Sequence, residues 1–77
     1  MRTQLDEPIE IGDVILIAKP RGGSGYAVIR DVLKRNCMVS YLAADGESWL
    51  RDKTIANETD LMFRLSNPEI KKIGLPI

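Results

Sequence analysis

The sequence predicts an all-β fold: a small five-stranded barrel with a short helical turn near residues 52–58 and an extended C-terminal tail. Short runs rich in β-branched residues alternate with turn residues at intervals of about ten positions, which is typical of strands. The chain has 77 residues, and five short strands in that length cannot build two large sheets. A small, strongly bent barrel is therefore the economical arrangement.

The first predicted strand covers 13–18, where β-branched residues direct apolar side chains to both faces of a sheet. The loop 19–25 follows, because proline cannot continue a ladder and glycine permits positive φ angles. The second predicted strand covers 26–33 and places Arg30 and Val32 on the same face. A helix over this stretch is the rival interpretation, since the apolar spacing also fits a helix, but the spacing of the turn signals favours a strand.

A third strand is predicted at 37–43, where Cys37, Val39 and Tyr41 share one face and Ser40 takes the other. The dipeptide Asp45-Gly46 is a strong hairpin signal. It predicts a fourth strand at 47–51, with Trp49 in its middle.

After the helical turn, the closing strand is predicted at 61–65. Pro68 begins a mostly polar tail whose apolar end, Ile73 and Leu75–Ile77, is expected to pack back onto the barrel or to contact a partner. We therefore divide the chain into an N-terminal arm (1–10), the barrel (11–66) and a C-terminal tail (67–77).

Composition argues against catalysis and metal binding. Histidine is absent, which removes the commonest metal ligand and the commonest general acid or base. Cys37 is the single cysteine, and an apolar, buried thiol is the favoured interpretation because no histidine is present to activate it. No phosphate-loop motif with a Gly-Lys-Ser/Thr triplet is present. We therefore expect no enzymatic activity, no cofactor and no metal.

The N-terminal residues predict a cytoplasmic protein. Residues 1–8 are polar and acidic and lack the apolar core of a signal peptide. The longest apolar stretch, Val14–Ala18, is far too short to span a membrane, so no membrane association is expected. A short chain that starts at Met1 also suits a small regulatory protein.

The charges are balanced overall, with 11 basic and 11 acidic residues, but they are distributed unevenly. Residues 19–35 contain five bases and one acid. Phosphate contacts need clustered charge and not net charge, so this segment is the candidate nucleic-acid-binding region. The candidate residues are Lys19, Arg21, Gly22, Gly23, Arg30, Lys34 and Arg35.

Each part of this region also has a purely structural interpretation. Backbone N–H groups of the glycines could approach phosphates beside Lys19 and Arg21, or the loop could be a solvated hairpin connection kept soluble by its charges. The remaining bases could extend a basic surface or protect an edge strand from pairing. Tyr26, Tyr41 and Trp49 are candidate stacking platforms, although core packing is the favoured role for aromatic residues in a small barrel.

The order of these segments resembles the KOW and Tudor families of Src-homology-3-like (SH3-like) small barrels. The resemblance is carried by Gly12-Asp13-Val14-Ile15, by Gly25-Tyr26-Ala27-Val28 after a glycine-containing loop, and by the hairpin around Asp45-Gly46. It covers roughly residues 11–55. It implies an SH3-like barrel and, on the KOW side, a nucleic-acid-binding accessory role. This sequence departs from the Tudor pattern, because a cage that reads methylated side chains needs several aromatic residues and only Tyr26, Tyr41 and Trp49 are available.

Two functions remain open from the sequence. The first is a non-enzymatic, KOW-like protein that makes sequence-tolerant contacts with the phosphates of DNA or RNA. The second is a protein-interaction adaptor or inhibitor that docks on a larger enzyme, which the neutral net charge and the apolar C-terminal end would suit. In either case a monomer or a weak homodimer is expected.

Overall fold

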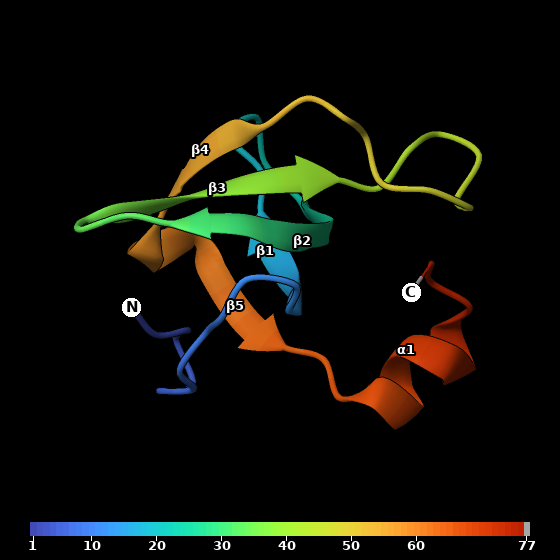
Figure 1. Cartoon of the computed structure of the whole chain (residues 1–77), viewed down its shortest axis with the longest axis horizontal. Coiled ribbons are helices and arrows are strands. Elements are labelled where there is room, and N and C mark those ends of the chain that lie inside the picture. The colour runs from blue at the N-terminus through green and yellow to red at the C-terminus, as the bar shows by residue number, and fades with distance from the viewer. Residues whose placement is uncertain (77) are drawn as a thin grey trace.

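The computed structural model describes residues 1–76, and its centre is one antiparallel sheet of five strands (Figure 1). The strands are β1 (Val14–Ala18), β2 (Ser24–Val32), β3 (Asn36–Tyr41), β4 (Thr54–Asn57) and β5 (Leu61–Arg64). Their order in the sheet is β4-β3-β2-β1-β5, so the last strand returns beside the first. The prediction of a mostly β fold with five strands is confirmed, whereas the sheet is open.

Both faces of the sheet are covered by apolar side chains. On one face, residues of all five strands and of the N-terminal arm form the first cluster: Ile9, Ile15, Ile17, Ala27, Ile29, Cys37, Val39, Ala56 and Leu61. On the other face, Val14 and Val28 pack with Leu65, Ile70 and Leu75 in a second cluster. Strand β1 therefore buries side chains on both faces, as its apolar sequence predicts.

A β-bulge in β2 changes which side chains share a face. Ile29 pairs with Val39 and Asp31 pairs with Met38, so Arg30 is an extra residue without a partner on β3. An extra residue inverts the alternation beyond it. Val32 consequently packs against the first cluster, and the prediction that it shares a face with Arg30 is wrong.

The fourth strand lies later in the chain than predicted. Around the Asp45-Gly46 turn, Trp49 forms only an isolated bridge with Leu42, and the ladder resumes where Thr54 pairs with Val39. Leu42 lies three positions after Val39, but Thr54 lies five positions after Trp49. The additional residues cannot pair, and they interrupt the hairpin.

The helical turn expected near 52–58 is also displaced. Residues 54–57 form β4, and a 3₁₀ turn follows at Glu58–Asp60. This turn leads directly into β5, which pairs with β1 through Ile15–Arg64 and Leu16–Phe63. The turn therefore redirects the chain from one edge of the sheet to the other.

The prediction of an extended C-terminal tail is wrong, because the helix α1 (Asn67–Ile73) occupies most of it (Figure 1). Ser66 caps the helix: its hydroxyl accepts a bond from the Glu69 N–H, and the Glu69 carboxylate accepts one from the Ser66 N–H. Gly74 ends the helix in the left-handed conformation, with φ 86°. Leu75 then packs beside Ile70 on the sheet.

The helix cap makes one pH-dependent prediction. Hydrogen bonds from the Ser66 backbone and side chain lower the pKa of Glu69 from 4.5, against a weaker opposing effect of burial. A carboxyl whose pKa is lower in the folded state stabilises the fold above its unfolded pKa, and loses that effect as the pH falls through the folded value. We expect Glu69→Gln to flatten the dependence of the melting temperature on pH below about 4.5. Thermal unfolding followed by circular dichroism measures this.

Glu47→Gln is the matched control for this prediction, because Glu47 is exposed and its carboxylate forms no hydrogen bond within residues 1–76. An unchanged pH profile in Glu69→Gln, or an equal change in Glu47→Gln, would contradict the role of the cap.

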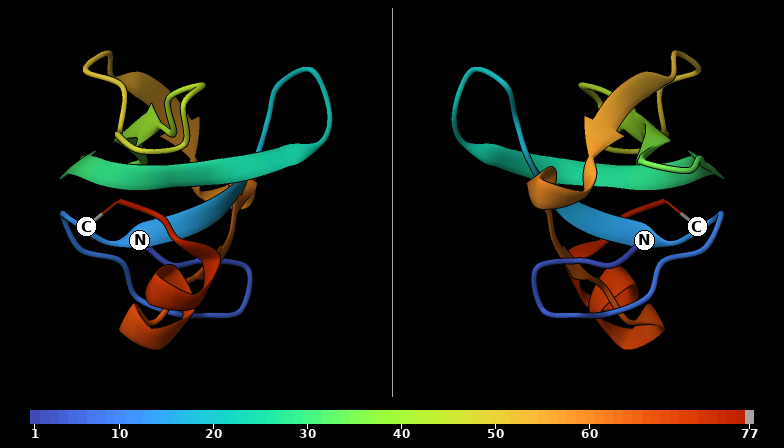
Figure 2. Two further views of the ribbon diagram at one scale, coloured as in Figure 1. Left: turned by 90° about the vertical axis from the view of Figure 1, so that its right-hand side faces the viewer. Right: turned by 90° about the vertical axis from the view of Figure 1, so that its left-hand side faces the viewer.

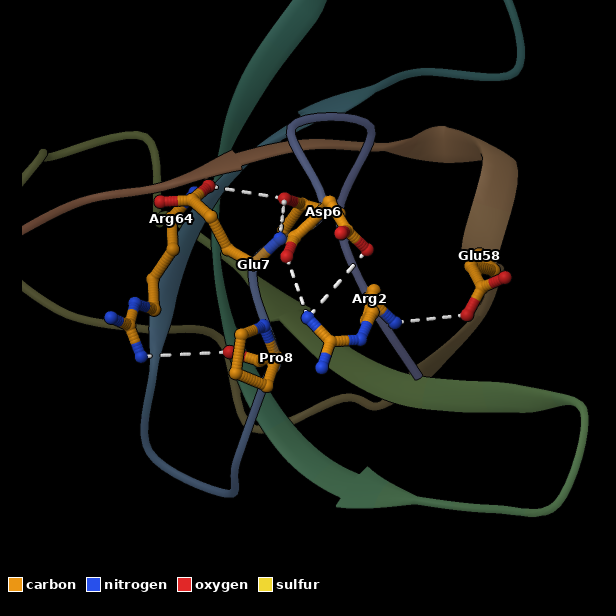
Figure 3. Close-up of polar contacts among 7 residues, drawn as sticks. Arg2, Asp6, Glu7, Pro8, Glu58 and Arg64 are labelled. Carbon is orange, nitrogen blue, oxygen red and sulfur yellow. Dashed lines mark hydrogen bonds and ion pairs between the residues drawn. The ribbon is translucent and has the colours of Figure 1, made fainter.

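The N-terminal arm covers the outer edge of β5 (Figure 3). The Gln4 N–H donates to the Leu61 carbonyl at 2.8 Å, and the Arg64 N–H donates to a Glu7 carboxylate oxygen at 2.9 Å. The Arg2 N–H donates to Glu58 at 2.9 Å. The bonds at Leu61 and Arg64 satisfy backbone groups of an edge strand that would otherwise be open to pairing with another chain.

Within the described residues no helix is long and apolar enough to cross a bilayer; α1 has seven residues.

Candidate nucleic-acid interface

The loop that joins β1 and β2 begins with a tight turn. The Gly22 N–H donates to the Lys19 carbonyl at 3.0 Å, with Pro20 at the second position, where its fixed φ is favourable. The Lys19 N–H donates to the Gly23 carbonyl at 3.1 Å. Gly22 and Gly23 have φ angles of 95° and 75°, which side chains disfavour. The glycines therefore shape the loop, and the Gly22 N–H is used within the turn and not left for a phosphate.

This loop and the third and fourth strands line an open surface pocket of about 340 Å³. Its lining brings Lys19, Pro20 and Arg21 together with Tyr41 of β3 and Thr54 of β4. The two cations are exposed, and the Tyr41 ring is half-buried against the first apolar cluster. Two exposed positive charges thus lie beside an aromatic ring that packs against the first cluster.

The tyrosine in this pocket stays neutral at ordinary pH. Burial raises the pKa of Tyr41 above 10.0, and the negative charge of Asp60 acts in the same direction. An uncharged ring does not repel an anion bound by the neighbouring cations, so the pocket can accept a phosphate and a flat apolar group at once.

Gly25 leaves the room that Lys19 occupies. A Cβ atom at Gly25 would lie 2.6 Å from Cε of Lys19, so the aliphatic part of the lysine crosses the bare backbone of β2. The glycine thereby lets the lysine lie flat along the strand at the pocket. This is a role that the sequence alone did not indicate.

Lys34 and Arg35 do not belong to this pocket. They occupy the tight turn between β2 and β3, closed by a bond of 2.9 Å from the Leu33 N–H to the Asn36 carbonyl. The nine residues of β2 separate this turn from the first loop by roughly 26 Å. Figure 2 shows the cyan loop after β1 projecting at one end of β2, with the β2–β3 connection at the other.

Arg30 and Trp49 lie neither at the loop pocket nor at the β2–β3 turn. Both line a second and larger pocket beside α1, where Trp49 is half-buried against the second apolar cluster. Tyr26 packs against the same cluster and lines neither pocket. Of the three candidate stacking residues, the structure therefore brings only Tyr41 together with the loop cations.

Sequence reasoning missed two residues that line the loop pocket, Pro20 and Thr54. Pro20 was visible as a turn residue between the two cations. Thr54 carried no local signal, because it reaches the pocket through the pairing of β4 with β3, which the predicted strand at 47–51 had misplaced.

The other candidate chemical groups have structural partners. Cys37 is fully buried, burial raises the pKa of its thiol above 9.0 with Asp60 adding to the effect, and its Sγ donates to the Ala56 carbonyl at 3.7 Å. Asp45 accepts a bond from the Glu47 N–H at 2.9 Å and so supports the turn around Gly46. Among residues 1–76, no group of three or more His, Cys, Asp or Glu side chains is arranged to hold a metal ion.

Comparisons with protein-family models, with curated proteins and with solved structures gave no match for this chain.

Proposed function

We propose that this chain is a small, non-enzymatic, SH3-like module of the cytoplasm that binds single-stranded nucleic acid without strong sequence preference. One observation carries the proposal: Lys19 and Arg21 share a pocket with the half-buried ring of Tyr41. Proteins that bind single strands combine cations that follow the phosphates with aromatic rings on which bases stack. A stacked base must be free of a duplex, so the geometry favours single strands.

The order of the strands supports the SH3-like part of the proposal. The fifth strand returns beside the first, and a 3₁₀ turn comes immediately before it. A short helical turn before the last of five strands supports the SH3-like topology that the sequence resemblance implies, although the sheet is open.

A titration of fluorescence anisotropy tests the binding. Labelled single-stranded DNA, single-stranded RNA and duplex DNA are each titrated at low and at moderate salt, with wild type and with Lys19→Ala/Arg21→Ala. Single strands are expected to bind, and the double variant should reduce the log–log slope against salt by about 1.4 because two phosphate contacts are lost.

The charge-matched control is Lys34→Ala/Arg35→Ala, which removes the same two charges at the far end of β2. It should lower the slope far less than the loop variant. Equal losses in the two variants would show a diffuse charge effect and contradict the site. Absence of binding to all three nucleic acids at low salt would overturn the proposal and leave the protein-docking alternative.

The protein-docking alternative has lost one of its supports. It relied on the apolar C-terminal end, but Leu75 is buried beside Ile70 on the chain's own sheet. Ile73 remains 47% exposed, and Ile77 lies outside the described residues.

A further inference from the structure

A pocket of about 470 Å³ lies on the face of the sheet away from the first apolar cluster. Its apolar lining comes from Val14 and Val28 on the sheet, from Ile70 on α1, and from Trp49 of the loop between β3 and β4. A volume of this size is in the range of small-molecule sites, which are mostly apolar with a few placed polar groups.

The placed polar group in this pocket is Arg30. As the extra residue of the β2 bulge, it projects on the same side as Val28 and lines the pocket. Its Nε donates to the Ser40 hydroxyl at 3.1 Å, and that hydroxyl donates to the Asp52 carbonyl at 3.0 Å. Ser40 is fully buried, so its hydroxyl binds Arg30 Nε from the interior side of the pocket wall.

The charge of Arg30 is not neutralised within the described chain. The ion pairs there join Arg2 to Asp6 and Arg64 to Asp13, and neither involves Arg30. With Nε engaged by Ser40, the terminal amino groups remain as a planar fork that matches a carboxylate.

The rest of the lining favours a compact organic anion. Lys71 of α1 adds a second positive charge, and no Asp or Glu side chain is among the described lining residues. Asn67 is the one neutral polar side chain there, which leaves few partners for the hydrogen-bonding edges of a nucleotide base. An acid with an apolar body fits both the charge and the apolar walls.

We propose that this pocket binds a small amphipathic organic acid, with its carboxylate on the Arg30 fork and its aliphatic or aromatic body between the sheet and α1. This site is separate from the loop pocket, and the proposal does not rest on nucleic-acid binding. Ser40 acts as a positioning residue, because it orients Arg30 and does not itself line the pocket.

Trp49 provides the signal for a test, since it is the one tryptophan of the chain and lines the pocket. The full chain is titrated with octanoate, with the neutral analogue octanamide and with adenosine monophosphate, following tryptophan emission and the amide shifts in proton–nitrogen NMR spectra. Octanoate is expected to saturate, to shift the amides of Gly12, Arg30 and Lys71, and to bind at least about ten-fold more tightly than octanamide, because the charge-assisted bond is lost in the amide.

Arg30→Gln should weaken octanoate binding about ten-fold or more and leave octanamide binding unchanged. Arg35→Gln, an equal change of charge at the β2–β3 turn, should leave both unchanged, and Ser40→Ala should weaken octanoate alone. The NMR spectra of the variants report whether each remains folded.

Three results would overturn the proposal: no saturable shift with octanoate in either measurement, equal affinity for octanoate and octanamide, or tighter binding of adenosine monophosphate than of octanoate. Shifts confined to Lys19–Gly23 would likewise place the anion at the loop and not at Arg30.

Discussion

Replacing Ile29 with alanine is expected to destabilise the fold by about 2–5 kcal/mol. Ile29 is fully buried in the middle of the sheet, between the paired strands β1 and β3, and contributes to the first apolar cluster. A cavity there cannot collapse easily, because backbone ladders fix the strands on both sides. A domain of this size has little stability to lose, so the urea concentration at which half of the protein is unfolded should fall well below that of wild type. Urea unfolding followed by circular dichroism measures the loss.

Ile55→Ala is the matched control, because the same side chain on β4 is 61% exposed. Its free energy of unfolding should stay within about 0.5 kcal/mol of the wild-type value. If Ile55→Ala proved as costly as Ile29→Ala, the edge of the sheet at β4 would be buried in solution by a second molecule. If Ile29→Ala kept the wild-type midpoint, the assignment of the core would be wrong.

Replacing Tyr41 with leucine is expected to weaken binding of a single strand by about 1–3 kcal/mol, or roughly 5- to 150-fold. Leucine retains the apolar contact with the first cluster but removes the flat ring beside Lys19 and Arg21. The salt dependence should stay as in wild type, because no charge is lost. Anisotropy titrations at two salt concentrations separate this result from a loss of phosphate contacts.

Tyr26→Leu is the corresponding control on the opposite face. Tyr26 is half-buried against the second cluster and lines neither pocket, so the same substitution should change stability and leave nucleic-acid binding unaltered. Equal losses of affinity in the two variants would indicate that binding follows stability, and would argue against stacking on Tyr41.

Two parts of the fold carry strong local sequence signals, and only one of them, the loop at 19–25, was predicted. The end of the chain carries a capping box at Ser66 and Glu69 and a helix-ending glycine at Gly74, which together indicate a helix. The interpretation of Pro68 as the start of a tail overlooked them, although proline is tolerated in the first turn of a helix. The loop at 19–25 was predicted because its proline and glycines act within a few residues of chain.

What the sequence by itself determined follows from local chemistry. Alternation along β3 placed Cys37, Val39 and Tyr41 on one face, and the apolar run of β1 indicated burial on both of its faces. These patterns depend only on the period of a strand and on which side chains avoid water. The basic segment at 19–35 was likewise visible from residue types alone.

Only the tertiary structure decided how these parts meet. Whether β2 contains a bulge and where β4 resumes pairing depend on the register between strands, and register is set by packing across the whole sheet. The bulge directs Arg30 to the face of the pocket beside α1, and the length of β2 separates Lys34 and Arg35 from the loop. Of the three candidate stacking residues, only Tyr41 lines the pocket that contains Lys19 and Arg21. A single basic segment in the sequence thus becomes three separate surfaces, because neighbouring positions along a strand diverge in space while paired strands bring distant positions together.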